Sequence, residues 1–182
     1  GNEAASAIIL AAGPSLHRQN SVANIVDAGY QGTVIAADGA LSHCLRAGLV
    51  PDYVVTLDPH PSRIARWFGD PNIAAVEDDY FRRQDLDPEM GVNELQRNQE
   101  LIELVDKHGP DIKLIASTSV SNSVTERCKQ AAMPIYWWNP LFDDFDAPDS
   151  LTKQIFEMNR IPCMVSGGNV GSAAWVFAHG VL

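Results

Sequence analysis

Six short apolar runs, each followed by a stretch of helical character, constrain this sequence more than any other feature. The runs cover residues 6–12, 32–38, 53–57, 112–116, 135–138 and 162–165. Strands that alternate with helices in this way form βαβ units, and such units build a parallel sheet with right-handed crossovers. The sequence therefore predicts an α/β protein with a Rossmann-like, three-layer, doubly wound and mostly parallel sheet.

The first run ends in Gly13, Pro14 and Ser15, which predict a tight turn that opens a helix. Gly13 has no Cβ, so it can adopt a positive φ or let a ligand approach the backbone. Pro14 suits the first helical position, where its missing N–H costs nothing. A helix start carries a partial positive charge, and Ser15 adds a hydroxyl beside it, so this turn is a candidate phosphate site.

A polar or glycine residue also ends each of the other five runs. These residues are Asp38 with Gly39, Asp58 with Pro59, Ser117 with Thr118 and Ser119, Asn139 with Pro140, and Ser166 with Gly167, Gly168 and Asn169. In open parallel sheets, ligands bind outside the carboxyl ends of the strands. Turns commonly use the same residue types, but six successive cases favour one shared crevice for a ligand.

Two of these turns, at residues 13–15 and 166–169, open helices and are candidate phosphate cradles. Neither turn contains the Lys followed by Ser or Thr of a Walker A loop, and neither has the G-x-G-x-x-G spacing of a nicotinamide site. We expect a small nucleotide ligand at this edge. Its candidate contacts are Gly13, Pro14, Ser15, Gly39, Ser117, Thr118, Asn139, Ser166, Gly167, Gly168 and Asn169.

Asp38 and Asp58 end two strands that we expect to be neighbours. Two carboxylates placed there suit Mg²⁺ on a diphosphate, because Mg²⁺ takes one or two carboxylates together with phosphate oxygens. His60, between two prolines just past Asp58, is a candidate general base or phosphate partner. The alternatives are that Asp38 caps the next helix, that Asp58 starts a turn, and that His60 has no role.

Charge and composition exclude several classes of function. The chain has 182 residues and a formal net charge of −10, whereas a nucleic-acid-binding face needs a basic stripe. No apolar run approaches the roughly 20 residues that cross a bilayer. Cys44, Cys128 and Cys163 are far apart, which favours reduced thiols. We therefore expect a cytoplasmic protein that binds neither nucleic acid nor membrane.

The remaining segments are expected to connect or cover the sheet. Between the third and fourth strands we expect a short helix at 63–68, a weak edge strand at 72–76, a loop at 77–91 and a helix at 93–108. A capping box at 123–126 predicts the start of another helix. The acidic run at 143–149 is more typical of a solvated loop than of a metal site, with Asp149 or Ser150 capping the next helix.

No linker divides the chain, so we expect one domain over residues 1–182. A last helix from residue 170 has no strand after it, although a parallel sheet would supply one. We therefore expect the domain to be the core of a longer protein.

Four stretches of the sequence resemble a known family. They are Ala11–Leu16 (AAGPSL), Ala37–Ala40 (ADGA), Ala47–Pro59 (AGLVPDYVVTLDP) and Ser166–Val170 (SGGNV). They look like the core domain of the motility accessory factor (Maf) proteins, which is grouped with the 6-hydroxymethylpterin diphosphokinase (MptE-like) proteins. The G-x-x-P-D-x-V-V-x-x-D stretch is the most specific part of this resemblance.

The resemblance implies two activities. Maf proteins are linked to the transfer of nonulosonic sugars onto flagellin, which implies a CMP-sugar donor and flagellin or another protein or glycan as acceptor. The pterin diphosphokinases, and the similar thiamine pyrophosphokinase, move diphosphate from ATP with Mg²⁺. In these kinases, the positions that match Asp38 and Asp58 help to form the site. The kinases carry a richer acidic run where this chain has Leu57-Asp58-Pro59, and this departure favours the Maf interpretation.

The sequence thus predicts a nucleotide-sugar glycosyltransferase, or the core domain of one. Asp58, Asp38 and His60 are its candidate catalytic residues. The first alternative is an Mg²⁺-dependent diphosphokinase with Asp38 and Asp58 as metal ligands. The second is a nucleotide-binding module without catalytic activity.

Overall fold

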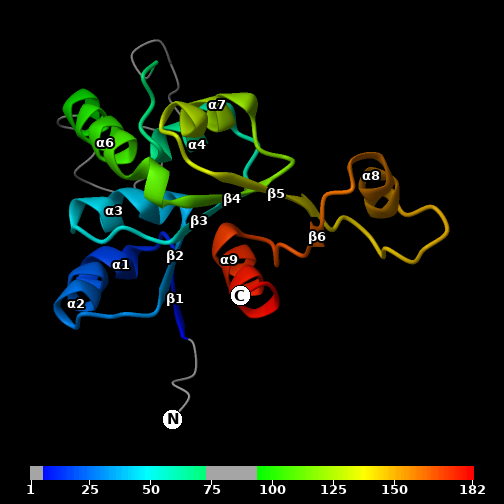
Figure 1. Ribbon diagram of the computed structural model, residues 1–182, viewed down its shortest axis with the longest axis horizontal. Helices are drawn as coiled ribbons and strands as arrows, with labels where there is room; N and C mark the ends of the chain where they lie inside the picture. The colour runs from blue at the N-terminus through cyan, green and yellow to red at the C-terminus, as the bar shows by residue number, and fades with distance from the viewer. Residues whose placement is uncertain (1–5, 73–93) are drawn as a thin grey trace.

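The computed structural model describes residues 6–72 and 94–182, and its strands form one six-stranded parallel sheet (Figure 1). The strands are β1 (Ala7–Leu10), β2 (Thr33–Ala37), β3 (Tyr53–Thr56), β4 (Lys113–Ser117), β5 (Ile135–Pro140) and β6 (Cys163–Met164). All five pairings between these strands are parallel. The structure therefore confirms the predicted Rossmann-like, three-layer α/β class.

The strands lie side by side in the order of the chain, from β1 to β6, without a reversal. Sequence patterns did not predict this order. A doubly wound sheet usually reverses its strand order at one point, and its helices then fall on both faces. Here the helices between β1 and β5 pack on one face, which we call the outer face. The opposite, inner face is covered by α9 (Val170–Gly180), around which the sheet curls (Figure 1).

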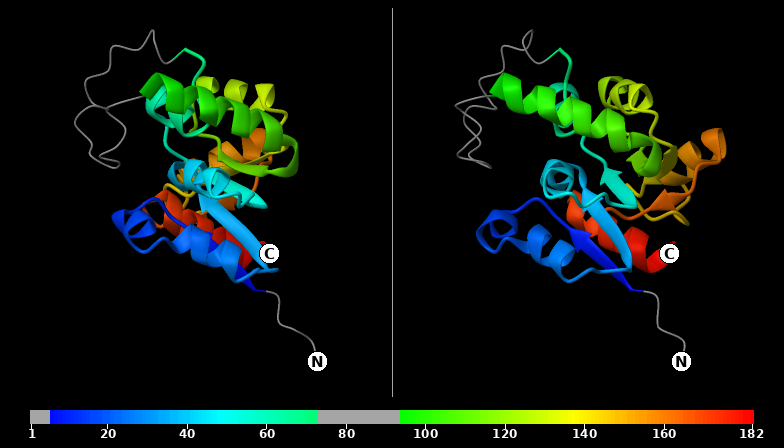
Figure 2. Two further views of the ribbon diagram at one scale, coloured as in Figure 1. Left: turned by 90° about the vertical axis from the view of Figure 1, so that its left-hand side faces the viewer. Right: turned by 60° about the vertical axis from the view of Figure 1, so that its left-hand side comes forward.

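The outer face carries the larger core. Its helices are α1 (Pro14–Arg18), α2 (Ser21–Asp27), α3 (Leu41–Arg46), α4 (Pro61–Trp67), α6 (Glu94–His108) and α7 (Asn122–Gln130). Short 3₁₀ turns, η1 (Asp38–Ala40) and η4 (Gly109–Asp111), follow β2 and α6. Figure 2 shows these helices following one another along the sheet, with α9 on the other side of β1 and β2. Val34, Val54 and Leu114 point from the strands into this core.

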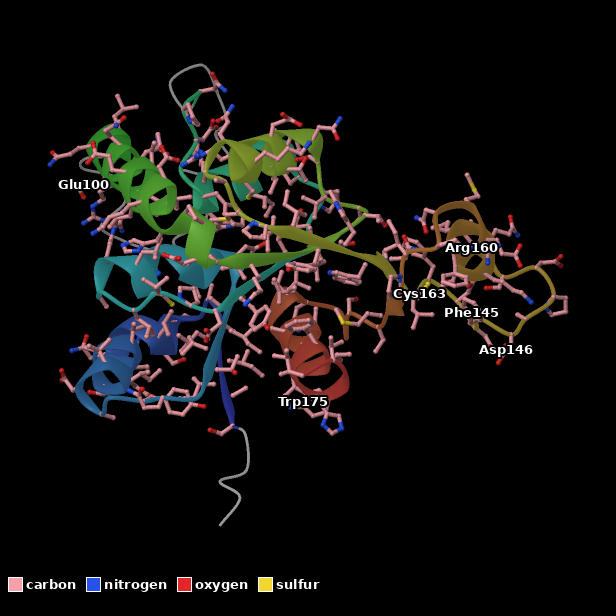
Figure 3. All side chains as sticks on the ribbon, in the orientation of Figure 1. Glu100, Phe145, Asp146, Arg160, Cys163 and Trp175 are labelled. Atoms are coloured by element: carbon pink, nitrogen blue, oxygen red, sulfur yellow. The ribbon has the colours of Figure 1, made fainter. Side chains whose placement is uncertain are left out.

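The inner face carries a smaller core, in which Ile35, Val55 and Ile115 pack against α9. The rings of Tyr53 and Phe177 meet edge to face, with centroids 5.2 Å apart. The segment 141–162, which we call the arm, joins β5 to β6 and carries α8 (Leu151–Asn159). Figure 3 shows the arm, with Phe145 and Arg160 labelled, extending away from the sheet. None of the helices in the described ranges is long and apolar enough to cross a bilayer.

Several predicted helices are confirmed, and two helix starts differ. The short helix after Asp58 is α4, the helix expected at 93–108 is α6, and Ser150 caps α8 by accepting a hydrogen bond from the Lys153 amide. The capping box at 123–126 does not form, because α7 begins at Asn122 after Ser121. The Ser123 hydroxyl instead donates to the Pro61 carbonyl at 3.1 Å.

The helix expected after Ser15 is divided into α1 and α2. Asn20, with φ 52°, stands between them in the left-handed region. Asn adopts this conformation more easily than most residues. The edge strand at 72–76, apart from Asn72, and the loop at 77–91 lie outside the described residues.

Candidate functional site

Three of the predicted turns meet at the carboxyl edge of the sheet. A Cβ placed on Gly39 would lie 2.9 Å from the Cβ of Ala12, so the turns after β1 and β2 are in contact. A Cβ on Gly171 would lie 3.1 Å from the Cβ of Ala11, so the first turn of α9 reaches the same place. The glycine at each of these positions permits the close approach. The turns at 13–15, 38–39 and 166–169 therefore form one continuous surface.

Hydroxyl groups join the ends of the next three strands. The Ser119 hydroxyl, after β4, donates to the Leu57 carbonyl at the end of β3, at 2.8 Å. The Thr118 hydroxyl donates to the Asn139 side-chain oxygen, at 3.0 Å, at the end of β5. The structure thus brings all six strand ends to one edge, as the sequence predicted, with direct contacts between neighbours.

The turn after β1 has the predicted form. Pro14 is the first residue of α1, and the Leu16 amide donates to the Gly13 carbonyl at 2.9 Å. Gly13 is half-buried and Ser15 is exposed, so the Ser15 side chain faces the solvent at the sheet edge. The helix that follows has only five residues, so its dipole adds little to an anion site.

Asp38 is the most buried of the predicted catalytic groups, with 5% of its surface exposed. One carboxylate oxygen accepts a hydrogen bond from the Thr56 hydroxyl at 2.8 Å, and the other accepts from the Gly39 amide at 2.7 Å. Both donors favour the ionised carboxylate and hold it in one orientation. Thr56 lies on the neighbouring strand β3 and is fully buried. Sequence reasoning missed Thr56, because a threonine inside an apolar strand is usual.

Asp58 follows β3 and is half-buried. Its side-chain oxygen Oδ1 accepts a hydrogen bond from the His60 amide at 2.9 Å, so Asp58 shapes the turn that leads into α4. The turn alternative considered for Asp58 is therefore present in the structure. His60 is half-buried beside it, immediately before Pro61. Asp58 and His60 remain near enough to the surface to contact a ligand.

Whether this edge fits a divalent cation depends on the carboxylates of Asp38 and Asp58. Among the described residues, no group of three or more His, Cys, Asp or Glu side chains is placed to hold a metal ion by itself. Both oxygens of Asp38 already accept hydrogen bonds, whereas Asp58 is partly open to solvent. One accessible carboxylate suits Mg²⁺ that takes its remaining ligands from phosphate and water. The described donor set therefore offers one partly exposed carboxylate, that of Asp58, to a cation brought by a nucleotide.

Asn139, a predicted ligand contact, is fully buried, and its amide is satisfied inside the protein. Its nitrogen donates to the Asn159 side chain and to the Ile161 carbonyl, both at 2.9 Å. Its oxygen accepts from Thr118 and Asn159, both at 3.0 Å. An amide offers two donors and one acceptor oxygen with two lone pairs, so this side chain has no group left for a ligand. It fixes the arm to the sheet.

Ser117 is also fully buried, and its hydroxyl lies 2.8 Å from that of Ser119. Ser119 and Thr118 are the exposed residues of this turn. Thr118 and Asn139, which the sequence assigned to a ligand, therefore hydrogen-bond each other across neighbouring strand ends.

The turn at 166–169 opens α9 as predicted. Gly167 and Gly168 have φ values of 65° and 88°, which favour glycine. The Asn169 side-chain oxygen accepts from the Ser172 amide at 2.9 Å and caps the helix. Gly167, Gly168 and Asn169 are exposed, so their backbone is open to solvent at this edge.

A comparison with protein-family models identifies one similarity. Residues 2–72 match the model described as 6-hydroxymethylpterin diphosphokinase MptE-like. The match confirms the predicted resemblance to MptE-like proteins over this segment, which contains the turns after β1, β2 and β3. No curated protein matches the chain at a significant level. The family match suggests a nucleotide-related, diphosphokinase-like function, and the nucleotide-sugar interpretation stays a prediction.

Proposed function

Because residues 2–72 match the MptE-like family, we propose that the protein binds a nucleoside triphosphate at the carboxyl edge of its sheet and transfers diphosphate to an alcohol. The observation that carries this proposal is the position of the match. It ends after α4 and includes Gly13, Asp38 and Asp58, which follow three neighbouring strands. The family description supports a hydroxymethylpterin as the alcohol.

The reaction needs accurate placement more than covalent help from the protein. The hydroxyl oxygen of the acceptor attacks the β-phosphorus of ATP. The bond from that phosphorus to the oxygen shared with the α-phosphate breaks, and AMP leaves. The acceptor's proton passes to a base or to solvent, and His60, beside Asp58, is the candidate base. A bound Mg²⁺ neutralises charge that develops on the phosphate oxygens.

The described residues have different roles in this proposed reaction. Asp38 is held by Thr56 and the Gly39 amide, so its negative charge has a fixed position below the edge. Asp58 is partly exposed and is placed to contact the cation. The glycine turns before α1 and α9 would offer backbone to the phosphates, since Gly167 and Gly168 are exposed at this edge.

The proposal is tested by calorimetric titration with a non-hydrolysable ATP analogue and with CMP, each with and without Mg²⁺. We expect the ATP analogue to bind only with Mg²⁺, and Asp58→Asn to weaken it by about tenfold or more, since a charged contact is lost. Asp111→Asn is the matched control, because Asp111 is an exposed carboxylate just before β4, at the opposite edge. This variant should bind the analogue as the wild type does.

Turnover gives a second readout. With ATP, Mg²⁺ and 6-hydroxymethylpterin, we expect AMP to be released in step with consumption of the pterin. CMP binding that does not depend on Mg²⁺ would instead favour the nucleotide-sugar prediction. Mg²⁺-dependent binding without AMP release would indicate a binding module, and binding of neither nucleotide would contradict the proposed site.

A further inference from the structure

A hollow of about 570 Å³ lies on the inner face of the sheet. Its walls come from β3 to β6 and from the C-terminal half of α9. Tyr53 and Lys113, which line it, are the first residues of β3 and β4. Gly180, at the end of α9, also lines it. The hollow therefore extends along the inner face from the first residues of β3 and β4 to Leu141 and Val165, and it shares no residue with the candidate nucleotide contacts.

Most of the wall is aromatic or aliphatic. Tyr136 of β5 lines the hollow with 53% of its surface exposed, and Val165 after β6 is half exposed. Large apolar side chains with this exposure usually mark a binding surface when they are contiguous. The volume lies within the range of pockets that hold small molecules, roughly 300–1,000 Å³.

Two polar groups in the wall have no hydrogen-bond or ion-pair partner among the described residues. The Lys113 ammonium lies 4.9 Å from the centre of the Tyr53 ring, and among the described residues it has no carboxylate partner. Trp138 is 4% exposed, and its indole N–H has no hydrogen-bond acceptor in the described part of the chain. A buried donor without an acceptor is unfavourable, and native proteins contain few of them.

From these observations we propose that the hollow binds a small amphipathic anion, with a flat apolar body and one acidic group. The apolar body lies against Tyr136, Met164 and Phe177, where it removes apolar surface from water. The acidic group pairs with Lys113 at the rim. A lysine beside an aromatic wall is a selective feature in a chain whose net charge is −10, because most of the surface repels anions.

This proposal does not rest on the proposed nucleotide function. Its residues line the inner face, and none of them is among the candidate nucleotide contacts. Either proposal can fail without the other.

Two dyes with nearly the same aromatic skeleton separate the apolar contribution to binding from the contribution of the charge. The probes are 8-anilinonaphthalene-1-sulfonate, which carries a sulfonate, and N-phenyl-1-naphthylamine, which carries no charge. We expect each dye to bind with one molecule per chain. Lys113→Gln should weaken the sulfonate dye about three- to fivefold, as for a partly exposed ion pair, and leave the neutral dye unchanged. Lys107→Gln, on α6 over the outer face, is the matched control and should change neither.

Cys163 supplies a local readout, because it lines the hollow and is partly exposed (Figure 3). Cys44 and Cys128 are buried in the outer core. Bound dye should slow alkylation of Cys163 by N-ethylmaleimide. Val176→Trp places a larger side chain in the wall and should abolish binding of both dyes. In this variant Cys44 and Cys128 should still be protected from N-ethylmaleimide, which would show that the protein is folded.

Two results would overturn the proposal. Dye fluorescence without protection of Cys163, or unchanged by Val176→Trp, would place the dyes elsewhere. A chain that elutes as a dimer, with Cys163 already unreactive in the absence of dye, would show that a second copy fills the hollow.

Discussion

The two faces of the sheet are covered in different ways, although the same strands supply both. On the outer face, Ala36, Val54 and Leu114 stand in register and are fully buried. One residue further along each strand, Val55 and Ile115 are also buried on the inner face. Tyr136, which continues this inner row on β5, is 53% exposed. Coverage of the inner face therefore decreases at Tyr136, although Trp138, further along β5, is 4% exposed.

The difference follows from the number of helices. Each outer helix belongs to a connection between neighbouring strands, so every pair of strands from β1 to β5 receives at least one helix. The inner face receives only α9 among the described helices. A helix with its side chains is about 10–12 Å wide and strands lie about 4.8 Å apart, so one helix covers two or three strands. A sequential strand order thus leaves an apolar surface on one face.

The largest expected difference between the faces is in thiol reactivity. Burial raises the pKa of Cys44 and of Cys128, both in the outer core, to about 12. At pH 8 only about one in ten thousand of these thiols is ionised, and the thiolate is the reactive form. Titration of the native protein with Ellman's reagent should therefore show one fast thiol, Cys163. All three thiols should react in denaturant, and a second fast thiol in the native state would mean that the outer core is open.

Stability should show the next largest difference. Leu114→Ala removes a fully buried side chain from the outer core and should cost about 2–5 kcal/mol of unfolding free energy. Tyr136→Ala, on the next strand but facing the open part of the inner face, should cost under about 1 kcal/mol. Urea denaturation of both variants measures the contrast. A loss for Tyr136→Ala as large as that for Leu114→Ala would show that the inner row is covered in solution.

The sequence predicted the strands and their polar ends well, because both depend on local chemistry. An apolar run followed by Gly13-Pro14-Ser15 or by Asp38-Gly39 allows few other conformations. These turns lie at one edge because parallel strands end together. The turn at 166–169 was predictable for the same reason, since Asn169 is a strong helix cap.

The features that were not predicted depend on contacts between distant residues. Nothing local encodes the strand order, and nothing in the sequence near Asn139 indicates its pairing with Asn159. Leu95 on α6 is 62% exposed, whereas Leu101 and Val105 of the same helix are buried. Helical spacing identifies a face, but it does not determine how far the neighbouring sheet extends beneath it.

The smallest expected effect concerns the arm, which lies outside both cores. The Thr152 hydroxyl and the Leu151 amide, with Ser150 and the Thr152 amide, hold the pKa of Asp143 at about 2, below its ordinary 3.8. Because the folded-state pKa is lowered, this carboxylate stabilises the start of α8 above about pH 4. That contribution is lost as the pH falls toward 2.

Hydrogen exchange should therefore show the amides of Leu151 and Thr152 losing protection between pH 4 and pH 2, before the amides of β4 do. Asp143→Asn should remove this pH dependence, because its side chain does not titrate. Asp146→Asn is the control, since the exposed Asp146 side chain makes none of these bonds. Simultaneous loss of protection in the arm and in β4 would contradict this prediction, because it would mean that the arm unfolds only together with the sheet. In that case the hydrogen bonds of Asn139 would stabilise the arm more than those of Asp143 do.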